Sequence, residues 1–235
     1  MSKKSDPANI TPLQRKFLNC MLSKRTMIAA YIYDQLKDKK KESNQDPYSK
    51  MFSQKNNADL IIPAISASVY ADILGCLTKY LGEANKSGVY SALKQLKKQK
   101  SSYFVSDLTI QNQVQISYDF AKSSMFSMVS RLYSVALSNP DNLQEEIEKY
   151  LTKIFTLLAV TESMRQKVRG ATSTLKEAKV EKVALKAEYK TAGDSRVCPI
   201  CSSYQGKVMS IDEVSDLIPQ HPGCRCWFEV VGYAS

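Results

Sequence analysis

The sequence predicts a mainly α-helical protein, an elongated helical body or bundle, with a small α+β module at its C-terminal end. Apolar residues recur at steps of three and four along most of the first part of the chain, which is the spacing of one helix face. Near residue 190 the pattern changes to short segments separated by Cys, Pro and Gly. We therefore predict a disordered N-terminus, a helical region, a long helical connector and a C-terminal module, at residues 1–9, 10–140, 141–189 and 190–235.

The composition suits a soluble protein with an acidic partner. With 26.4 kDa and 43% hydrophobic residues, the chain can bury a real core. No apolar run approaches the roughly 20 residues of a membrane span, and the polar N-terminus shows no secretory signal. Lys and Arg number 33 against 23 Asp and Glu, giving a pI near 9.2, which favours nucleic acid or an acidic protein surface as partner.

The first helix is expected to begin at Thr11 and to run to about Glu42. Thr11 is a suitable N-cap, and Pro12 suits the first helical position. Its predicted apolar face consists of Leu13, Phe17, Cys20, Ile28, Tyr31 and Ile32. Residues 41–57 are polar, so we predict a connector there.

A second helix is expected to begin near Pro63, with apolar residues at steps of four. This stripe consists of Ile65, Val69, Ile73, Leu77 and Leu81. Cys20 belongs to the first stripe and Cys76 lies beside the second. We interpret both as buried thiols, because free Cys behaves as a small apolar residue.

Three further helices are predicted before the C-terminal module. A short basic helix covers residues 91–100, and a longer one covers about 106–137, with methionines on its packed face. After the break at residues 139–141, another helix is expected to end at Gly170. Its apolar face consists of Leu143, Ile147, Leu151, Ile154, Phe155 and Leu158.

A lysine stripe follows on what the sequence predicts to be one more helix. Thr174 and Glu177 have the spacing of a capping box, which would restart a helix towards Tyr189. Four lysines then recur at steps of three and four: Lys179, Lys182, Lys186 and Lys190. They form either a solvated helix face or a contact for DNA or an acidic partner, in which case the contact would be to phosphate without sequence preference.

The last stretch has the spacing of a metal site, Cys198-x2-Cys201-x19-His221-x2-Cys224, with Cys226 two positions further on. It uses the single histidine and four of the six cysteines. Two such pairs complete the tetrahedral shell that Zn²⁺ prefers, and four protein ligands make a structural site. The best-spaced set is Cys198, Cys201, His221 and Cys224. Cys226 is the alternative, replacing either His221 or Cys224.

Other interpretations of these cysteines fit less well. A disulfide framework would need an oxidising compartment, and no secretory signal is visible. A thioredoxin-like CxxC would need a βαβ pattern, whereas the preceding segment reads as a lysine-rich helix. Unrelated loop thiols would leave the coincidence with the only histidine unexplained. We therefore expect a structural Zn²⁺ ion.

The remaining residues of the module are predicted to form short helices and strands around this zinc knuckle. Gly206 permits a turn, and residues 207–209 read as a strand. Ser210 and Glu213 form a capping box that starts a brief helix to Leu217. A terminal strand rich in strand-forming residues follows from Trp227.

The region from Thr161 onward resembles the C-terminal region of the Mu F-like head morphogenesis family, the minor head proteins of tailed bacteriophages. The ordered features are a Thr-Glu pair on a helix, an aromatic residue followed by Thr and Asp, a Val-Cys-Pro-x-Cys knuckle, a Gly, and a closing His-Pro-x-Cys-Arg-Cys. Here they fall on Thr161, Glu162, Tyr189, Thr191, Asp194, Cys198, Cys201, Gly206 and the run 221–226. The family usually has Trp at the position of Tyr189 and often Asn at that of Gly223. Residues before 140 carry no matching motif.

The resemblance implies a non-enzymatic structural protein of the virion, made in the host cytoplasm and located in the head interior or at the portal vertex. Portal or capsid proteins would be its partners, with packaged or ejected DNA as a further contact and no small-molecule substrate. The alternative is a cellular zinc-ribbon protein that binds nucleic acid, favoured by the lysines and the pI. A hydrolase fits least, because His221, the one histidine, is predicted to bind the metal.

Overall fold

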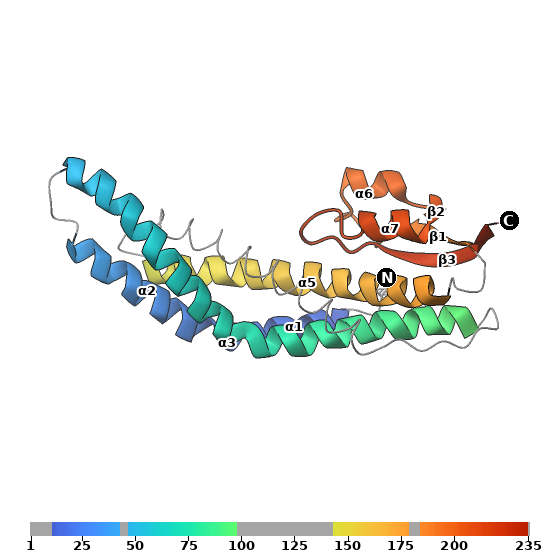
Figure 1. Cartoon of the computed structure of the whole chain (residues 1–235), viewed down its shortest axis with the longest axis horizontal. Coiled ribbons are helices and arrows are strands. Elements are labelled where there is room, and N and C mark those ends of the chain that lie inside the picture. Colours follow the sequence, from blue (N-terminus) through green and yellow to red (C-terminus); the bar gives the residue numbers. More distant parts are fainter. Residues whose placement is uncertain (1–10, 43–46, 98–142, 179–183, 235) are drawn as a thin grey trace. The chain divides into compact units, whose positions relative to one another are not determined.

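The computed structural model describes residues 11–42, 47–97, 143–178 and 184–234 (Figure 1). This part of the chain is mainly helical with one small C-terminal sheet, which confirms the predicted fold class. The elements are α1 (Thr11–Leu22), α2 (Arg25–Glu42), α3 (Pro47–Lys97), α5 (Leu143–Ala178), β1 (Ala184–Lys190), α6 (Pro199–Tyr204), β2 (Val208–Ser210), α7 (Ile211–Leu217) and β3 (Trp227–Ala234). None of the helices in these ranges is both long and apolar enough to cross a bilayer.

The chain divides into two compact units, each assembled from separated parts of the sequence. Unit 1 consists of Met1–Phe17, Thr78–Ser117 and Leu157–Ser235. Unit 2 consists of Leu18–Leu77 and Tyr118–Thr156. Helices α3 and α5 therefore contribute to both units, and unit 1 contains the whole of the Cys/His module.

The helix predicted from Thr11 to Glu42 is in fact two helices. A break falls at Ser23 and Lys24, where the Ser23 hydroxyl donates to the Cys20 carbonyl oxygen at 2.7 Å. Serine competes in this way with the helical hydrogen-bond ladder, which explains the interruption. Within unit 2, Arg25 at the start of α2 pairs with Glu148 of α5 at 3.4 Å.

Helix α3 begins earlier than predicted and includes most of the expected connector. It starts at Pro47 rather than near Pro63, so the polar residues from position 47 to 57 are helical. Polar composition alone does not end a helix, because Lys, Gln and Met are good helix formers. The stripe at Val69, Ile73, Leu77 and Leu81 is buried as predicted. The predicted basic helix is the end of α3 up to Lys97, and the helix predicted at 106–137 and the break after it lie outside the described residues.

Cys20 and Cys76 are not free thiols but form a disulfide that joins α1 to α3 within unit 2. Their Cα atoms are 5.9 Å apart, a separation that a disulfide can bridge. The prediction of two buried thiols was wrong because helical periodicity places each cysteine on a face without showing which residue it meets. Of the six cysteines, only the four of the C-terminal module remain free.

We predict that air-equilibrated protein, denatured and stripped of metal, will show four reactive thiols before reduction and six afterwards. The disulfide withholds Cys20 and Cys76 from alkylation, whereas the module cysteines become accessible on denaturation. Mass spectrometry after differential alkylation measures both numbers. Six alkylated cysteines before reduction would contradict the disulfide.

Helix α5 continues through Gly170, the residue predicted to end it, as far as Ala178. Thr174 lies inside the helix and donates its hydroxyl hydrogen to the Gly170 carbonyl oxygen at 2.8 Å. It therefore caps no new helix, and the predicted capping box with Glu177 is wrong.

Gly170 instead allows α3 and α5 to approach each other closely within unit 1. A Cβ atom on Gly170 would collide with the Asn85 carbonyl oxygen, and one on Gly88 would collide with the Lys167 carbonyl oxygen. The two backbones touch at these positions because neither glycine carries a side chain.

The segment predicted to be a helix towards Tyr189 is the central strand of a sheet ordered β2-β1-β3. Strand β1 pairs antiparallel with both neighbours, placing Glu188 opposite Val208 and Tyr189 opposite Phe228. Its odd-numbered residues are buried and its even-numbered residues face outward, as alternation in a strand requires: Leu185, Ala187 and Tyr189 against Lys186, Glu188 and Lys190.

The helical lysine stripe is therefore wrong as a structural prediction. Lys186 and Lys190 lie on the outer face of β1, while Lys179 and Lys182 lie outside the described residues. Lys190 pairs with Glu188 at 2.7 Å, and Glu229 is 3.9 Å away. The outer face of the strand is thus mixed in charge rather than uniformly basic.

The module does not form a separate core but shares one with the helices of unit 1. Ala92 of α3 and four residues of α5 belong to the same buried cluster as the strands and the cysteines. The cluster consists of Ala92, Met164, Val168, Ala171, Leu175, Leu185, Ala187, Tyr189, Cys201, Ile211, Val214, Ile218, Cys224, Cys226 and Phe228. The Cys/His site is thereby anchored on the C-terminal half of α5.

Candidate metal centre

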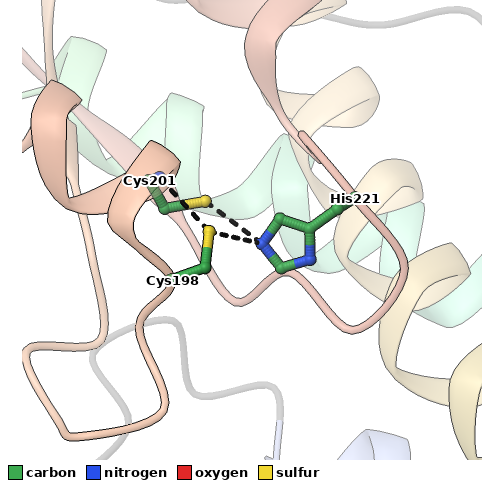
Figure 2. A group of neighbouring side chains, drawn as sticks. All are labelled: Cys198, Cys201 and His221. Atoms are coloured by element: carbon green, nitrogen blue, oxygen red, sulfur yellow. Dashed lines mark hydrogen bonds between the residues drawn. The ribbon is translucent and has the colours of Figure 1, made fainter.

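The first half of the site is a knuckle at the start of α6. Cys198 is the N-cap of this short helix and Pro199 occupies its first turn. The Cys198 sulfur accepts a hydrogen bond from the Cys201 backbone N–H at 3.3 Å. One tight turn thus presents both thiols to the same point, as the CxxC spacing predicts (Figure 2).

The second half is the turn after α7. The Cys224 N–H bonds to the His221 carbonyl oxygen at 3.1 Å, and Gly223 takes a positive φ of 79° that favours glycine. His221 Nδ1 lies 2.9 Å from the Pro222 carbonyl oxygen, which can only accept, so in the neutral ring Nδ1 carries the hydrogen and Nε2 the lone pair. That Nε2 faces the sulfurs of Cys198 and Cys201 at 3.1 and 3.3 Å (Figure 2).

All five predicted candidates come together close enough to bind a metal. They fall into two overlapping groups that share Cys201: Cys198, Cys201 and His221, and Cys201, Cys224 and Cys226. A tetrahedral Zn²⁺ centre places two sulfurs about 3.8 Å apart, and sulfur and nitrogen about 3.6 Å apart. The sulfurs of Cys201 and Cys224 are 3.9 Å apart, and the two sulfur–nitrogen distances fall within about half an ångström of that value. The thiol and imidazole donors, and these three distances within the two groups, therefore fit zinc.

The surroundings lower the pKa of two of the thiols and raise that of the other two. Hydrogen bonds from the Cys226 side chain and from backbone N–H groups lower the pKa of Cys224 to about 5. The Cys201 N–H lowers the pKa of Cys198. Burial raises the pKa of Cys201 to about 11, and interaction with Cys224, together with burial, raises that of Cys226. A cation at this point would offset the burial penalty, because metals bind the thiolate form.

An ion pair connects the two loops that carry the candidate ligands. The Arg225 guanidinium donates to both carboxylate oxygens of Asp194, at 2.9 and 2.5 Å, and Arg196 adds a bond at 3.0 Å. These bonds, with that of Arg225 the strongest, hold the pKa of Asp194 below its usual range. The pairing therefore contributes its full stability above the ordinary Asp pKa of about 4, and this contribution is lost as pH falls from there through the lowered pKa of the folded state. It joins the loop before Cys198 to the turn after His221.

A second link ties the end of β1 to the end of α6. Gln205 Oε1 accepts hydrogen bonds from the Thr191 backbone N–H and hydroxyl, both at 2.7 Å. Gly206, at a φ of 79°, turns the chain towards β2, which confirms the predicted turn. The role of Gln205 was not predicted, because nothing in its local sequence distinguishes it from an ordinary surface residue. Arg225 and Asp194 both belong to the motif series noted in the sequence, but their pairing was not predicted.

Helix α5 forms a hydrogen bond to the turn at residues 221–224, which we call the metal-site turn. Thr161 is buried, and its hydroxyl oxygen accepts a hydrogen bond from the Gly223 N–H at 2.7 Å. The next residue, Glu162, is fully buried and pairs with Arg165 at 2.7 Å. Thr161, the first residue of the Thr-Glu pair noted in the sequence, thus positions the turn between His221 and Cys224.

Replacing Thr161 by Val is expected to destabilise unit 1 by about 1 to 2 kcal/mol, because it leaves the Gly223 N–H without its acceptor. Denaturant unfolding followed by the fluorescence of Trp227, the only tryptophan, measures this loss. Thr156→Val is the control, since the exposed Thr156 hydroxyl bonds only within its own helix among the described contacts. Equal stability of the two variants would contradict this role.

Comparison with known proteins agrees with the resemblance seen in the sequence. Residues 138–229 match the family model described as Phage Mu protein F like protein. No curated protein and no solved structure matches the chain. The matched range contains α5, β1, β2, all five Cys/His candidates, and the contact between Thr161 and Gly223. The C-terminal region is thus similar to this family, and residues 1–137 lie outside the match.

Proposed function

We propose that this chain is a structural, non-enzymatic protein of a tailed-phage head, made in the host cytoplasm and incorporated into the virion. The family match over residues 138–229 is the observation that supports it. The matched range coincides with a helix joined to a Cys/His module through one shared core. Such a unit suits a rigid adaptor that docks on a portal or capsid protein.

The module is proposed to hold one structural Zn²⁺ ion through Cys198, Cys201, His221 and Cys224. Three thiolates and one imidazole complete a tetrahedral shell and leave no position for water, so the ion would connect the knuckle to the turn and support no hydrolysis. The free Nε2 of His221 and the backbone N–H bonds to sulfur support this assignment. Metal analysis of the purified chain should give one zinc ion per molecule.

Detection in particles tests the assignment to the virion. The chain should be found by mass spectrometry in density-purified phage particles from the genome that encodes it, with portal and capsid genes beside its reading frame. An abundant cytosolic host protein measured in the same samples controls for contamination. Absence of the chain from particles that contain their portal protein would refute the proposal.

A nucleic-acid-binding protein is the second candidate, and the formal net charge of +10 favours it. Any such contact would be to phosphate, so binding to short duplex DNA should weaken steeply with salt. The pairing of Lys190 with Glu188 reduces the basic character of the outer face of β1. A gel-shift titration decides, since no shift at low salt would eliminate this candidate and the proposed DNA contact of the head protein.

A further inference from the structure

Helix α3 has a basic and aromatic row of side chains on the face opposite α5. Within unit 1, α3 packs on α5 through Asn85, Gly88 and Ala92, which are buried (Figure 1). The residues at steps of three and four on the opposite face are all exposed, namely Lys79, Glu83, Lys86, Tyr90 and Lys94. We call the last three of them the α3 stripe.

Tyr90 is the most exposed large apolar side chain in the part of the chain that the structure describes, at 70%. Its ring contacts neither another ring nor a cation among these residues. Lys86 and Lys94 lie one turn away on either side, about 12 Å apart along the helix axis. An aromatic ring in water between two cations is typical of surfaces on which an unpaired base stacks while lysines contact the backbone phosphates.

The two lysines of the α3 stripe have no acidic partner among the described residues. Other cations form the ion pairs found there, for example Lys176 with Asp212 at 2.7 Å. Glu83 is exposed on the same face, but neither lysine forms an ion pair with it. The outer face of β1 differs, because Lys190 is paired there with a carboxylate. The uncompensated charges of the α3 stripe therefore complement the phosphate backbone of nucleic acid.

We propose that the α3 stripe binds single-stranded DNA, with Tyr90 stacking on an unpaired base and Lys86 and Lys94 contacting the phosphates beside it. This inference rests on the nucleic-acid contact discussed under the proposed function, and it adds the location of that contact and the form of the DNA. The stripe lies outside the family match, which begins at residue 138. Every base has a face on which a ring can stack, so binding should show little sequence preference.

Fluorescence anisotropy of a labelled oligothymidine strand, titrated with the full-length protein, tests the stacking. Tyr90→Ala should weaken binding about five- to a hundredfold, the range found when a stacking ring is replaced by alanine. Tyr90→Phe keeps the ring and should bind as the parent does. An abasic strand of the same length and a duplex of the same length offer phosphates but no unpaired base, so on both probes Tyr90→Ala should match the parent. An equal loss on the abasic strand, or no loss on oligothymidine, would overturn the stacking.

The double variant Lys86→Gln/Lys94→Gln tests the phosphate contacts. Each contact contributes about 0.7 to the slope of log affinity against log salt for a single strand, so the variant should reduce this slope by about 1.4. Lys16→Gln/Lys153→Gln is the matched control, because it removes the same charge from exposed positions on α1 and α5 and should keep the parent slope. Equal slopes for the two double variants would overturn the location.

The parent protein separates failure of this inference from failure of the nucleic-acid contact itself. All substituted side chains are exposed, so each variant should unfold at the denaturant concentration of the parent. If the parent binds neither single-stranded nor duplex DNA at low salt, the proposed contact fails and the α3 stripe with it. If the parent binds and the α3 variants bind as it does, the contact stands and this inference fails.

Discussion

Chelation of the proposed zinc ion is expected to unfold the C-terminal module while the helices of unit 2 stay folded. The knuckle and the turn at residues 221–224 are short, and the proposed ligands Cys201 and Cys224 belong to the buried cluster that α5 shares with the sheet. Structural zinc typically supplies about 10 to 16 kcal/mol of apparent binding free energy in small modules, which becomes folding free energy. Unit 2 has its own buried residues, including Ile28, Ile32 and Ile73, and depends on no ligand in the module.

Two spectroscopic signals distinguish unfolding of the C-terminal module from unfolding of the helices of unit 2. Trp227, the only tryptophan, lies in β3, so its emission should shift to the red on chelation, whereas far-UV circular dichroism should keep most of its helical signal. The Cys198→Ser/Cys201→Ser double variant should resemble the chelated parent and respond little to chelator. Unchanged Trp227 emission after verified removal of the metal would show that the module folds without it.

The C-terminal module was predictable because its signals are local. The knuckle, the turn at Gly206 and the capping box of Ser210 and Glu213 each depend on residues within a few positions of one another. In the capping box, the Ser210 hydroxyl accepts from the Glu213 N–H at 3.2 Å and the Glu213 carboxylate accepts from the Ser210 N–H at 2.8 Å. Short-range chemistry of this kind is little affected by the rest of the fold.

Strand β1 was predicted to be a helix because its composition favours one. The sequence from Ala184 to Lys190 consists largely of Ala, Leu, Lys and Glu, all good helix formers. Pairing with β2 and β3 on both sides and burial of Tyr189 outweigh that preference. Strand preference depends mainly on neighbours, and these are distant in sequence.

Separation along the sequence also explains why the contacts at the site were not predicted. Thr161 meets Gly223 across 62 positions, and Arg225 meets Asp194 across 31. The disulfide joins residues 56 positions apart. Periodicity shows which face of an element is apolar, but such pairings depend on how the elements pack.

Gly170→Ala is expected to destabilise unit 1 by about 2 to 3 kcal/mol, although alanine is the better helix former. The substitution gains about 1 kcal/mol of helix propensity, but its methyl group would overlap the Asn85 backbone. Backbone cannot rotate away as a side chain can, so the two helices must separate and loosen the packing beneath the metal site. Gly88→Ala should cause a similar loss through Lys167.

Gly82→Ala provides the matched control, because Gly82 is also in α3 and a Cβ there would meet nothing within 4 Å. This variant should be more stable than the parent by about 0.5 to 1 kcal/mol, since only the helix-propensity term remains. Denaturant midpoints followed by Trp227 emission compare the three variants. If Gly170→Ala were stabilised like Gly82→Ala, α3 and α5 could not touch through their backbones at this position.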